Sequence, residues 1–319
     1  SYDNCEVASL TLSDSIFNCA DSGINTITLT VFDVSGNSST ATAQLLVVDT
    51  TSPSVITQNI IAYLDSSGQV IISWLDLDSA STDNCTIASS ILSDSIFDCS
   101  DTGSINIVTL TVTDISGNSS SNDAQVIIID SLPPVVITQN LTIYLDTNGV
   151  ANITVIQINN GSYDNCGIET YSLSDTTFAC DDVGENAVTF TVSDYSMNTS
   201  SVQIIITVLD TIKPVIYSQS PTVYLDANGQ AILNVTQVDS GSYDNCSIGS
   251  IFLSDSLFNC GLVGVNDIYL MVSDVNGNID SSIVSVTVAD TIKPLVFAEN
   301  YQAYLNLAGE FTLGVNLIN

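Results

Sequence analysis

Basic residues are almost absent from this sequence. It has no histidine, and Lys213 and Lys293 are its only cationic side chains against 35 aspartates and glutamates, which gives a formal net charge of −33. Nucleic acids and anionic membrane surfaces are bound through lysine and arginine, so both are excluded as partners. The same deficit removes most general-base, phosphate-clamp and zinc chemistry. Because the acids cannot be neutralised within the chain, external cations are their natural complement.

Long apolar runs are absent as well. No stretch approaches the roughly 18 apolar residues that a membrane-spanning helix requires, and 126–129 is typical of the longest apolar patches. Ser1 is not followed by the charged and apolar regions of a signal peptide, so we expect any targeting signal to lie outside this segment. The chain is nevertheless 45% hydrophobic, which is enough for hydrophobic cores and argues against wholesale disorder.

The sequence repeats itself. An Asp-Asn-Cys motif recurs at almost constant intervals, with its cysteines at Cys5, Cys85, Cys166 and Cys246. A second cysteine follows each of them at the same short distance, at Cys19, Cys99, Cys180 and Cys260. A one-residue insertion falls in DTGSIN at 101–106, compared with DSGIN at 21–25. An extra residue within a strand would turn its side chains to the wrong face, so we expect a loop there.

The repeat is typical of β structure. Stretches such as TITLTVFD at 26–33 alternate β-branched or aromatic residues with threonine, as half-buried strands do. Gly, Asn, Asp and Ser cluster between these stretches as turn formers, and no stretch has a helical period. We predict an all-β fold, a tandem array of immunoglobulin-like β-sandwich domains of about 80 residues each.

The predicted domains follow the period of the repeat, and we number them as repeats one to five. Their boundaries are 1–50 (the C-terminal part of a repeat), 51–131, 132–211, 212–291 and 292–319 (the N-terminal part of a repeat). Residues 301–319 of the last repeat align with 141–159, and the repeat that it begins would continue into the motif at which the chain starts. We therefore expect a piece of a longer array.

Eight cysteines in four equal pairs indicate an oxidising compartment. The short spacing within a repeat is constant through the insertion, whereas the long spacing from one pair to the next changes with it. We therefore expect one disulfide inside each repeat, closing a segment that turns at Ser-Asp-Ser. Closing a loop of about 15 residues stabilises by about 3 kcal/mol in the chain-entropy model. Metal-binding thiolates are the alternative, disfavoured because C-x-x-C pairs and histidine are missing.

Recurrent aspartates are the candidate metal ligands. On an immunoglobulin-like topology the acids at the end of one repeat should face those in the Asp-Asn-Cys and Asp-x-Ser-Gly-Asn loops of the next. We expect two convergent sets, Asp65, Asp130, Asp164 and Asp194 at one junction and Asp146, Asp210, Asp244 and Asp274 at the following one. The equivalent positions elsewhere complete the predicted ligands: Asp49, Asp83, Asp114, Asp226 and Asp290.

Such clusters need a cation. Bare carboxylates about 4 Å apart repel by about 4 kcal/mol per pair at an effective dielectric of 20, and no basic partner accompanies them. Ca²⁺, at the weak affinities of extracellular modules, fits best, and no organic cofactor is expected. Two alternatives remain: calcium elsewhere in the repeat, and the ordinary hydrogen bonding of Asp and Asn in turns.

The motifs SYDNC, LSDSIFNC, LTVFDVSGN and VVDTTSP together resemble the hyalin-repeat (HYR)-like, immunoglobulin-like tandem repeats of giant secreted Bacteroidetes adhesins, such as SprB-like gliding adhesin filaments. The resemblance covers the whole chain, unit by unit. It implies a structural segment of an extracellular adhesin or surface filament, secreted and associated with the cell surface. Neighbouring repeats and other filament chains are the implied partners. Animal hyalin repeats place their cysteines differently, which ranks a eukaryotic matrix protein second.

The resemblance also gives meaning to Asp-[Ser/Thr]-apolar triplets, which look like the O-glycosylation signal of secreted proteins in that phylum. The candidate sites, including Thr-ended forms of the triplet, are Ser15, Ser95, Thr176, Ser256, Thr50, Ser131, Thr211 and Thr291. A chain so rich in Asp, Ser and Thr also produces such triplets by chance.

Catalysis is not expected. Paired acids can form a glycosidase site, but acids that recur with the period of the whole repeat argue for a scaffold. The alternative function is a carbohydrate- or ligand-binding array that uses loop aromatics. Tyr2, Tyr163 and Tyr243 occupy equivalent positions, although Thr82 stands there in repeat two.

Overall fold

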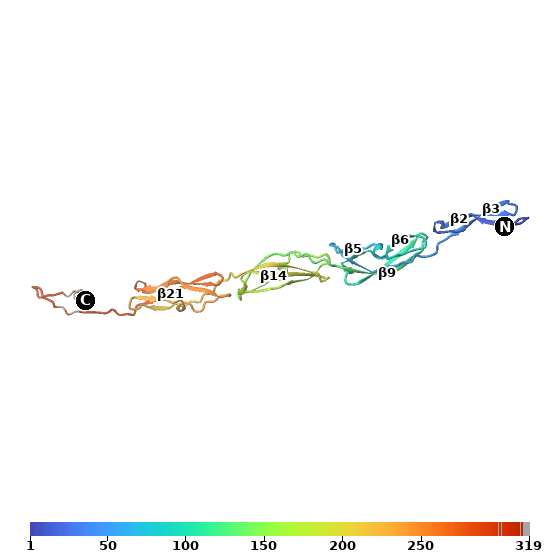
Figure 1. The fold of residues 1–319 in the computed structure, drawn as a ribbon. Helices are drawn as coiled ribbons and strands as arrows, with labels where there is room; N and C mark the ends of the chain where they lie inside the picture. The colour runs from blue at the N-terminus through green and yellow to red at the C-terminus, as the bar shows by residue number, and fades with distance from the viewer. Residues whose placement is uncertain (299, 301, 313, 315–319) are drawn as a thin grey trace. The chain divides into compact units, whose positions relative to one another are not determined.

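The structure is a computed structural model, and it describes residues 1–319 except 299, 301, 313 and 315–319. The chain divides into two compact units, whose strands are drawn in Figure 1. The first unit comprises Ser1–Gln139, Ile158–Ser174 and Thr189–Gln203. The second comprises Asn140–Gln157, Asp175–Val188 and Ile204–Asn319.

The first unit contains the sheets of repeats one and two. Repeat one supplies β1 (Val7–Leu12), the 3-10 turn η1 (Cys19–Asp21), β2 (Gly23–Asp33) and β3 (Ser38–Val47). Repeat two supplies β4 (Ile60–Tyr63), β5 (Gln69–Ile71), α1 (Trp74–Leu77), β6 (Ile87–Leu92), β7 (Ile96–Asp98), η2 (Cys99–Asp101), β8 (Ile105–Asp114) and β9 (Ser119–Ile129). The strand orders are β1-β2-β3, β4-β9-β8-β6 and β5-β7.

Repeat three repeats this pattern, and its long strands β14 and β15 contribute residues to both units. Its elements are β10 (Leu141–Tyr144), β11 (Val150–Asn152), α2 (Val155–Ile158), β12 (Ile168–Leu173), β13 (Thr177–Ala179), η3 (Cys180–Asp182), β14 (Gly184–Asp194) and β15 (Thr199–Leu209). The strand orders are β10-β15-β14-β12 and β11-β13.

Repeat four lies in the second unit. Its elements are β16 (Thr222–Tyr224), β17 (Gln230–Ile232), η4 (Val235–Gln237), β18 (Ile248–Leu253), β19 (Leu257–Asn259), η5 (Cys260–Leu262), β20 (Gly264–Asp274) and β21 (Ile279–Ala289). The strand orders are β16-β21-β20-β18 and β17-β19. The described residues of 292–319 form no strand.

Repeats two to four therefore share one architecture. A four-stranded sheet packs against a two-stranded one, and the first strand of each repeat runs parallel to its last, as β4 does beside β9. The fold is all-β, a tandem series of immunoglobulin-like β-sandwiches, which confirms the predicted fold class. The domain boundaries themselves stay a prediction. Among the described residues, no helix is long and apolar enough to cross a membrane.

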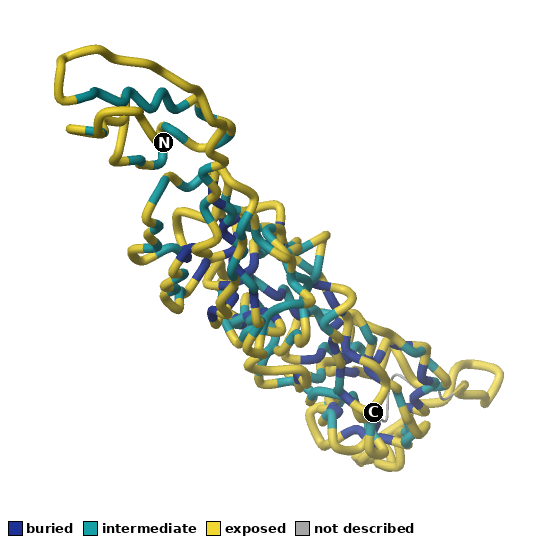
Figure 2. The backbone as a smooth tube through the Cα atoms, turned by 90° about the vertical axis from the view of Figure 1, so that its right-hand side faces the viewer, coloured by how far each residue is buried: buried dark blue, intermediate teal, exposed yellow. Residues whose placement is uncertain are grey.

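The core follows the two-residue period of the strands. Val108, Leu110 and Val112 on β8 are all 0% exposed, because alternate side chains of a strand point to one face of the sheet. Figure 2 colours the buried residues dark blue. Leu77, also 0% exposed, joins the core from the four-residue helix α1, an element too short for any sequence period to reveal.

The segment between the two cysteines of a repeat crosses the sandwich instead of turning back. In repeat two, β6 pairs with β8 so that Ile87 lies opposite Asp114, at one end of that strand. The chain then switches sheets, β7 pairs with β5, and Cys99 follows close to the other end of β8. A segment of this length, if extended, spans on the order of 40 Å. The chain does bend at Ser-Asp-Ser, where Oδ1 of Asp94 accepts from the N–H groups of Ser95 and Ile96, but this bend carries it from one sheet to the other. The predicted loop at 101–106 is confirmed by the turn at 103–104 that precedes β8.

Candidate metal centres and the disulfides beside them

The disulfides join successive repeats. Cys19 bonds to Cys85, Cys99 to Cys166 and Cys180 to Cys246, at sequence separations of 66, 67 and 66 residues. Disulfides within repeats were expected, and that pairing is wrong. A disulfide holds its two Cα atoms 5.3–5.4 Å apart here, whereas the two cysteines of one repeat lie at opposite ends of its sandwich. Cys5 and Cys260 are free and exposed.

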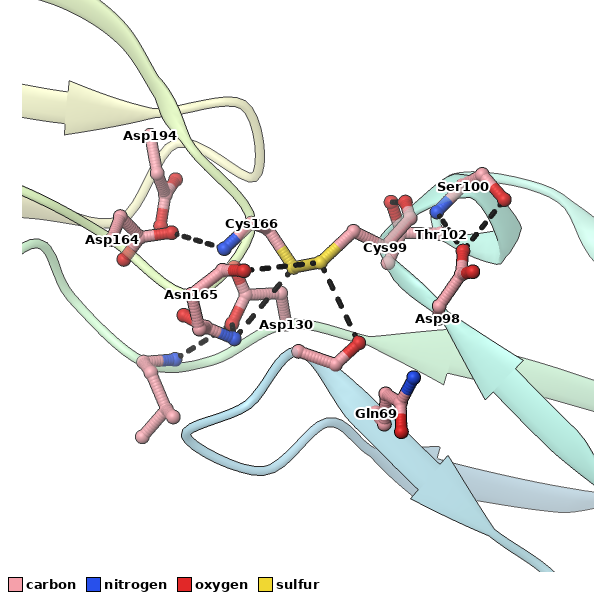
Figure 3. Close-up of a disulfide and its surroundings, with 12 residues drawn as sticks. Gln69, Asp98, Cys99, Ser100, Thr102, Asp130, Asp164, Asn165, Cys166 and Asp194 are labelled. Atoms are coloured by element: carbon pink, nitrogen blue, oxygen red, sulfur yellow. Dashed lines mark hydrogen bonds between the residues drawn. A yellow bond between two sulfur atoms is a disulfide. The ribbon is translucent and has the colours of Figure 1, made fainter.

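Two of the three inter-repeat disulfides sit over a glycine in the turn between the first two strands of a repeat. The Sγ atom of Cys99 lies 3.6 Å from the carbonyl oxygen of Gly68 and 3.5 Å from that of Asn165 (Figure 3). Gly68 has φ of +75°, and a Cβ atom there would lie 2.8 Å from the sulfur and 2.7 Å from the Asn165 oxygen. Only glycine therefore fits. Gly149 takes the same place beside Cys180.

Two clusters of aspartates lie beside these disulfides, one in each compact unit. The first unites Asp130, Asp164 and Asp194, and the second Asp210, Asp244 and Asp274; in each, one carboxylate oxygen per residue lies within 4.8 Å of the other two. Six of the predicted metal ligands are thus brought together as two sets of three.

The elements of two successive repeats build the first cluster. Asp130 follows β9 of repeat two, Asp164 lies in the Asp-Asn-Cys loop before β12 of repeat three, and Asp194 ends β14. Figure 3 shows Asp164 and Asp194 close together, with Asp130 beside Asn165. Asp130 is 3% exposed and Asp194 0%. The cluster therefore holds two buried carboxylates and one half-buried carboxylate.

Hydrogen bonds orient these carboxylates but leave acceptor capacity unused. Asp194 accepts from the backbone and side-chain amides of Asn198, both at 2.8 Å. Oδ1 of Asp130 accepts from Asn165 Nδ2 at 3.2 Å. Among the described residues, Oδ2 of Asp130 and Oδ1 of Asn165 are buried without a hydrogen-bond partner. Unpaired buried oxygens are costly, so the cluster has oxygens available for a ligand.

The electrostatics of the cluster also favour a cation. Burial raises the pKa of Asp164, and the charges of Asp130 and Asp194 raise it further, although the N–H of Cys166 lowers it. This is the expected response of a carboxylate placed near two others in a partly desolvated site. The chain's two lysines, Lys213 and Lys293, are both exposed.

The second cluster repeats these features. Asp210 accepts from Asn245 Nδ2 at 3.2 Å and from Asn276 Nδ2 at 2.8 Å. Oδ1 of Asp244 and Oδ1 of Asn245 are buried and without a partner among the described residues. The asparagine of the Asp-Asn-Cys motif thus contacts the cluster in both units. Sequence reasoning missed its role, although its place between the aspartate and the cysteine was a usable signal.

The corresponding acids of repeats one and two form a weaker set. Asp49 and Asp83 lie close together, with Cys85 as the nearest third candidate. The sulfur of Cys85 is bonded to Cys19, and a disulfide sulfur is a poor ligand for a hard cation. Asp114 is 2% exposed, yet it lies outside this set, with both carboxylate oxygens accepting from Asn118.

Three predicted ligands end a Tyr-Leu-Asp sequence and do not join the clusters: Asp65, Asp146 and Asp226. Asp65 is exposed, and its Oδ1 accepts from the N–H groups of Ser67 at 2.8 Å and Gln69 at 3.2 Å. Hydrogen bonds lower the pKa of Asp65, and the bond from the Ser67 hydroxyl has the largest effect. Asp146 and Asp226 close the same turn in later repeats. These carboxylates therefore accept hydrogen bonds within their own turns. Each expected set of four aspartates is a cluster of three, without Asp65 in the first and without Asp146 in the second.

The remaining predicted sites lie at the surface. Asp290 is exposed, and its Oδ1 accepts from Ile292 N at 3.0 Å. Of the eight candidate glycosylation sites, seven are exposed and Ser95 is half-buried. Glycosylation stays a prediction.

The donor set fits calcium. Ca²⁺ takes oxygen ligands at about 2.3–2.6 Å, so carboxylate oxygens within 4.8 Å of one another can reach one ion from different sides. Three carboxylates and a neutral amide oxygen are the ligand types that this cation prefers. We conclude that the geometry and chemistry of both three-aspartate clusters suit a single Ca²⁺ ion each.

Comparison with known proteins gives one curated relative of note. No family model matches the chain. Hyalin from Strongylocentrotus purpuratus is 31% identical over 295 residues, which is 86% of this chain and 24% of hyalin. The chain thus spans about a quarter of the length of that relative. This similarity supports the hyalin-repeat, immunoglobulin-like part of the resemblance, and the bacterial adhesin part stays a prediction.

The solved structures that match the chain include cadherin and immunoglobulin domains. Extracellular cadherin domains 1–4 of protocadherin gamma B7 match with a TM-score of 0.30 and 15% identity, covering 85% of this chain and 84% of that one. Mouse cadherin-23 domains EC22–24 match with a TM-score of 0.31 and 13% identity over 75% and 99% of the two chains. Immunoglobulin domains 1–5 of Sidekick-1 match with a TM-score of 0.33 and 9% identity, covering 86% of this chain and 68% of that one. No functional argument follows from likenesses this distant.

Proposed function

We propose that this chain is a structural segment of an extracellular, repetitive adhesion protein. In this proposal repeat two is fixed to repeat three, and repeat three to repeat four, by one disulfide and one bound calcium ion at each junction. The observation that carries it is the course of the disulfides, each of which joins the second cysteine of one repeat to the Asp-Asn-Cys cysteine of the following one.

One loop provides both links between repeats. Asp164 of the first cluster and Cys166 of the disulfide are separated only by Asn165. A disulfide that closes a loop as long as these stabilises by about 4 kcal/mol in the chain-entropy model. That gain is large for small domains, which bury a modest fraction of their surface. Such a disulfide restricts both the unfolding of a repeat and its rotation about the short Asp-[Ser/Thr]-x-x-Pro segment that joins it to its neighbour, 130–134 between repeats two and three.

Calcium would supply the charge that the chain lacks. Asp130, Asp164 and Asp194 would hold one ion, with Oδ1 of Asn165 as a further oxygen donor, and the second cluster would hold another. Because both clusters draw ligands from two successive repeats, an ion in them would resist separation of those repeats. An affinity of roughly 10⁻⁴–10⁻³ M is typical of extracellular modules. We infer that the array stiffens in calcium-rich fluid.

The wider role rests on the similarity to hyalin and on the surface chemistry. A chain of −33 charge with stapled repeats suits a long, soluble spacer or filament that displays adhesive surfaces away from a cell. O-linked sugars at the exposed Asp-[Ser/Thr] sites would further protect such a filament. A place in a cell-surface gliding filament is the most specific form of this proposal.

The calcium part is tested by thermal unfolding and small-angle scattering of the 319-residue chain in millimolar Ca²⁺ and in EDTA. We expect calcium to raise the unfolding temperature of the wild type and to narrow its range of conformations. The double variant Asp130→Asn, Asp210→Asn should lose this response. The matched control Asp65→Asn, Asp146→Asn removes two acids that lie outside the clusters and should keep it. If the unfolding temperature and the scattering of the wild type are the same in EDTA and in Ca²⁺, the proposal that calcium stiffens the array is wrong.

A further inference from the structure

Two tyrosine rings of repeat four stack on each other at the surface. The ring centroids of Tyr217 and Tyr243 lie 6.0 Å apart, and the ring planes are inclined by 23°. Tyr217 is 52% exposed and Tyr243 is 54% exposed. Among the described residues no other two tyrosines are stacked, since the remaining stacked contact joins Tyr171 to Phe190. The pair therefore places two phenols in contact where a dissolved oxidant can reach both.

The backbone holds both rings in place. Val215 and Tyr243 exchange two backbone hydrogen bonds, at 2.8 Å and 3.1 Å, so that Tyr217, two residues further on, is a diagonal neighbour of Tyr243. The N–H of Tyr217 donates to the hydroxyl of Ser242 at 3.1 Å, and its carbonyl accepts from Ser240 N at 2.9 Å. Because both main chains are anchored, the rings stay close together through more than their own stacking.

The same backbone arrangement carries other residues in repeats two and three. In repeat three the equivalent positions are Ile137 and Tyr163, and Tyr163 exchanges two backbone hydrogen bonds with Val135 at the same 2.8 Å and 3.1 Å. In repeat two the positions are Ile56 and Thr82. The geometry is thus common to these three repeats, and only repeat four has a phenol at both positions.

We propose that Tyr217 and Tyr243 are an oxidative cross-linking site, at which a haem peroxidase and hydrogen peroxide join the two rings as dityrosine within one chain. Holding two reacting groups side by side makes their coupling effectively unimolecular, so this pair reacts ahead of tyrosines without a phenolic neighbour. The cross-link goes beyond the proposed scaffold function and does not depend on bound calcium.

The reaction consumes one hydrogen peroxide per cross-link. Each phenol gives one electron and one proton to the oxidised haem, and hydrogen peroxide is reduced to two molecules of water. The two phenoxyl radicals combine through a new carbon–carbon bond between ring carbons ortho to the oxygens. Each of these carbons then loses its hydrogen as a proton, while each phenolic oxygen takes one up. The product therefore has two hydrogen atoms fewer than the two tyrosines.

The cross-link would fix the loop that carries an acid of the second cluster and a disulfide. Tyr243 directly precedes Asp244 and is followed shortly by Cys246, which is bonded to Cys180. Tyr217 belongs to the segment by which the chain enters repeat four after Pro214. A carbon–carbon bond would tie this loop to the entering segment, and it would persist in the thiols that exchange with disulfides.

Peroxidase treatment of the intact chain tests the proposal. The free thiols of Cys5 and Cys260 are first alkylated, because peroxide oxidises accessible thiols, and free tyrosine oxidised in parallel shows that the enzyme is active. We expect dityrosine fluorescence in the single-chain fraction, with the same yield per chain in dilute and in concentrated protein. Absence of dityrosine from that fraction, or a yield that falls on dilution, would overturn the proposal.

Proteolytic cleavage before aspartate locates the bond. It releases Tyr217 in the peptide 210–225 and Tyr243 in the peptide 239–243. Mass spectrometry should find these two peptides joined, with two hydrogen atoms lost. Dityrosine that joins any other pair of tyrosines instead would contradict the assignment.

A matched pair of variants separates the chemistry from the stacking. Tyr217→Phe should keep the ring contact but abolish the cross-link, because phenylalanine has no phenolic hydrogen to lose. Tyr224→Phe is the control, since it removes a phenol from the same peptide that is 63% exposed and lies outside the stacked pair. This control should leave the yield unchanged. Equal yields in the two variants would show that the stacked pair does not direct the coupling.

Ile137→Tyr transfers the pair to repeat three. The variant places a second phenol beside Tyr163, which is 58% exposed, on the same backbone arrangement. We expect a second cross-link per chain, between positions 137 and 163, whereas Ile56→Tyr, beside Thr82, should add none. If Ile137→Tyr forms no second cross-link, the shared backbone geometry does not bring the rings into reach and the basis of the proposal is wrong.

Discussion

The backbone N–H of Cys166 donates to Oδ1 of Asp164 over 2.8 Å. The residue that forms the disulfide with Cys99 therefore also orients a carboxylate of the first acid cluster. In the second cluster, Cys246 N donates to Asp244 at 2.9 Å in the same way. The covalent link and the candidate cation site are consequently coupled through one short loop, and the loss of either should weaken the other.

The double variant Cys99→Ser, Cys166→Ser tests this coupling. We expect it to lower the free energy of unfolding by about 2–4 kcal/mol and to weaken any calcium response of the first cluster, because the loop that holds Asp164 is released. Urea unfolding and calcium titration measure the two effects. Cys260→Ser is the control, since Cys260 has no disulfide in the structure. An unchanged calcium response in the double variant would argue against the coupling.

Gly68→Ala should prevent formation of the Cys99–Cys166 disulfide. The added methyl group would overlap the sulfur of Cys99 and the carbonyl of Asn165, both of which are held by surrounding structure. Thiol titration of the denatured protein should then show two more reactive thiols than in the wild type. Gly103→Ala is a matched control, because its φ of +74° carries the same backbone strain but no atom lies within 4 Å of the added carbon. Intact disulfide in Gly68→Ala would contradict the close packing.

Asp164→Asn should stabilise the protein in EDTA and abolish the calcium response of its cluster. The pKa of Asp164 is raised above the ordinary value of 3.8, by burial first and then by Asp130 and Asp194. The native state therefore binds more protons than the unfolded state between 3.8 and the raised pKa, and stability falls as pH rises through that range. The advantage of the variant should grow over the same range and stay constant above it, as urea unfolding in EDTA would measure.

Asp146→Asn should change the free energy of unfolding in the opposite direction to Asp164→Asn. Hydrogen bonds from Val150 and then Asn148 lower the pKa of Asp146 below 3.8. Its stabilising contribution is present above 3.8 and is lost as pH falls through the lowered pKa. This variant should therefore be less stable than the wild type at neutral pH and approach it in acid. The same sign for both variants would show that the two carboxylates do not differ in environment as described.

Leu77→Ala should destabilise repeat two by about 2–5 kcal/mol, because it leaves a cavity at a fully buried position of the core. Leu75→Ala, in the same one-turn helix but 65% exposed, should change the free energy of unfolding by less than about 0.5 kcal/mol. Chemical denaturation of the two variants measures the difference. Equal losses would mean that α1 is not anchored through Leu77.

Much of the fold was predictable from local sequence. The alternation in 26–33 and its equivalents predicts strands, since one side-chain face must be buried and the other can meet water. The position of the insertion at 101–106 predicts a loop for the same reason. The helix α1 was not predictable, because a single turn is too short for a periodic pattern.

The sites were predictable only in part. Topology alone places Asp130, Asp164 and Asp194 at one junction, because strand ends and loops at facing poles must meet there. It could not exclude Asp65, whose carboxylate is used by the hydrogen bonds of its own turn. It also missed Asn165, whose amide reaches Asp130 only once the two repeats are in contact.

The sequence by itself determined that the protein is acidic, repetitive and built of β-strands, because charge, period and alternation are properties of residues along the chain. Only the tertiary structure decided which cysteines pair. A short and constant spacing between two cysteines favours a bond within each repeat when the segment between them is taken for a loop. Once that segment crosses the sandwich as extended strand, Cys85 and Cys99 lie at opposite ends, and each meets a cysteine of a neighbouring repeat.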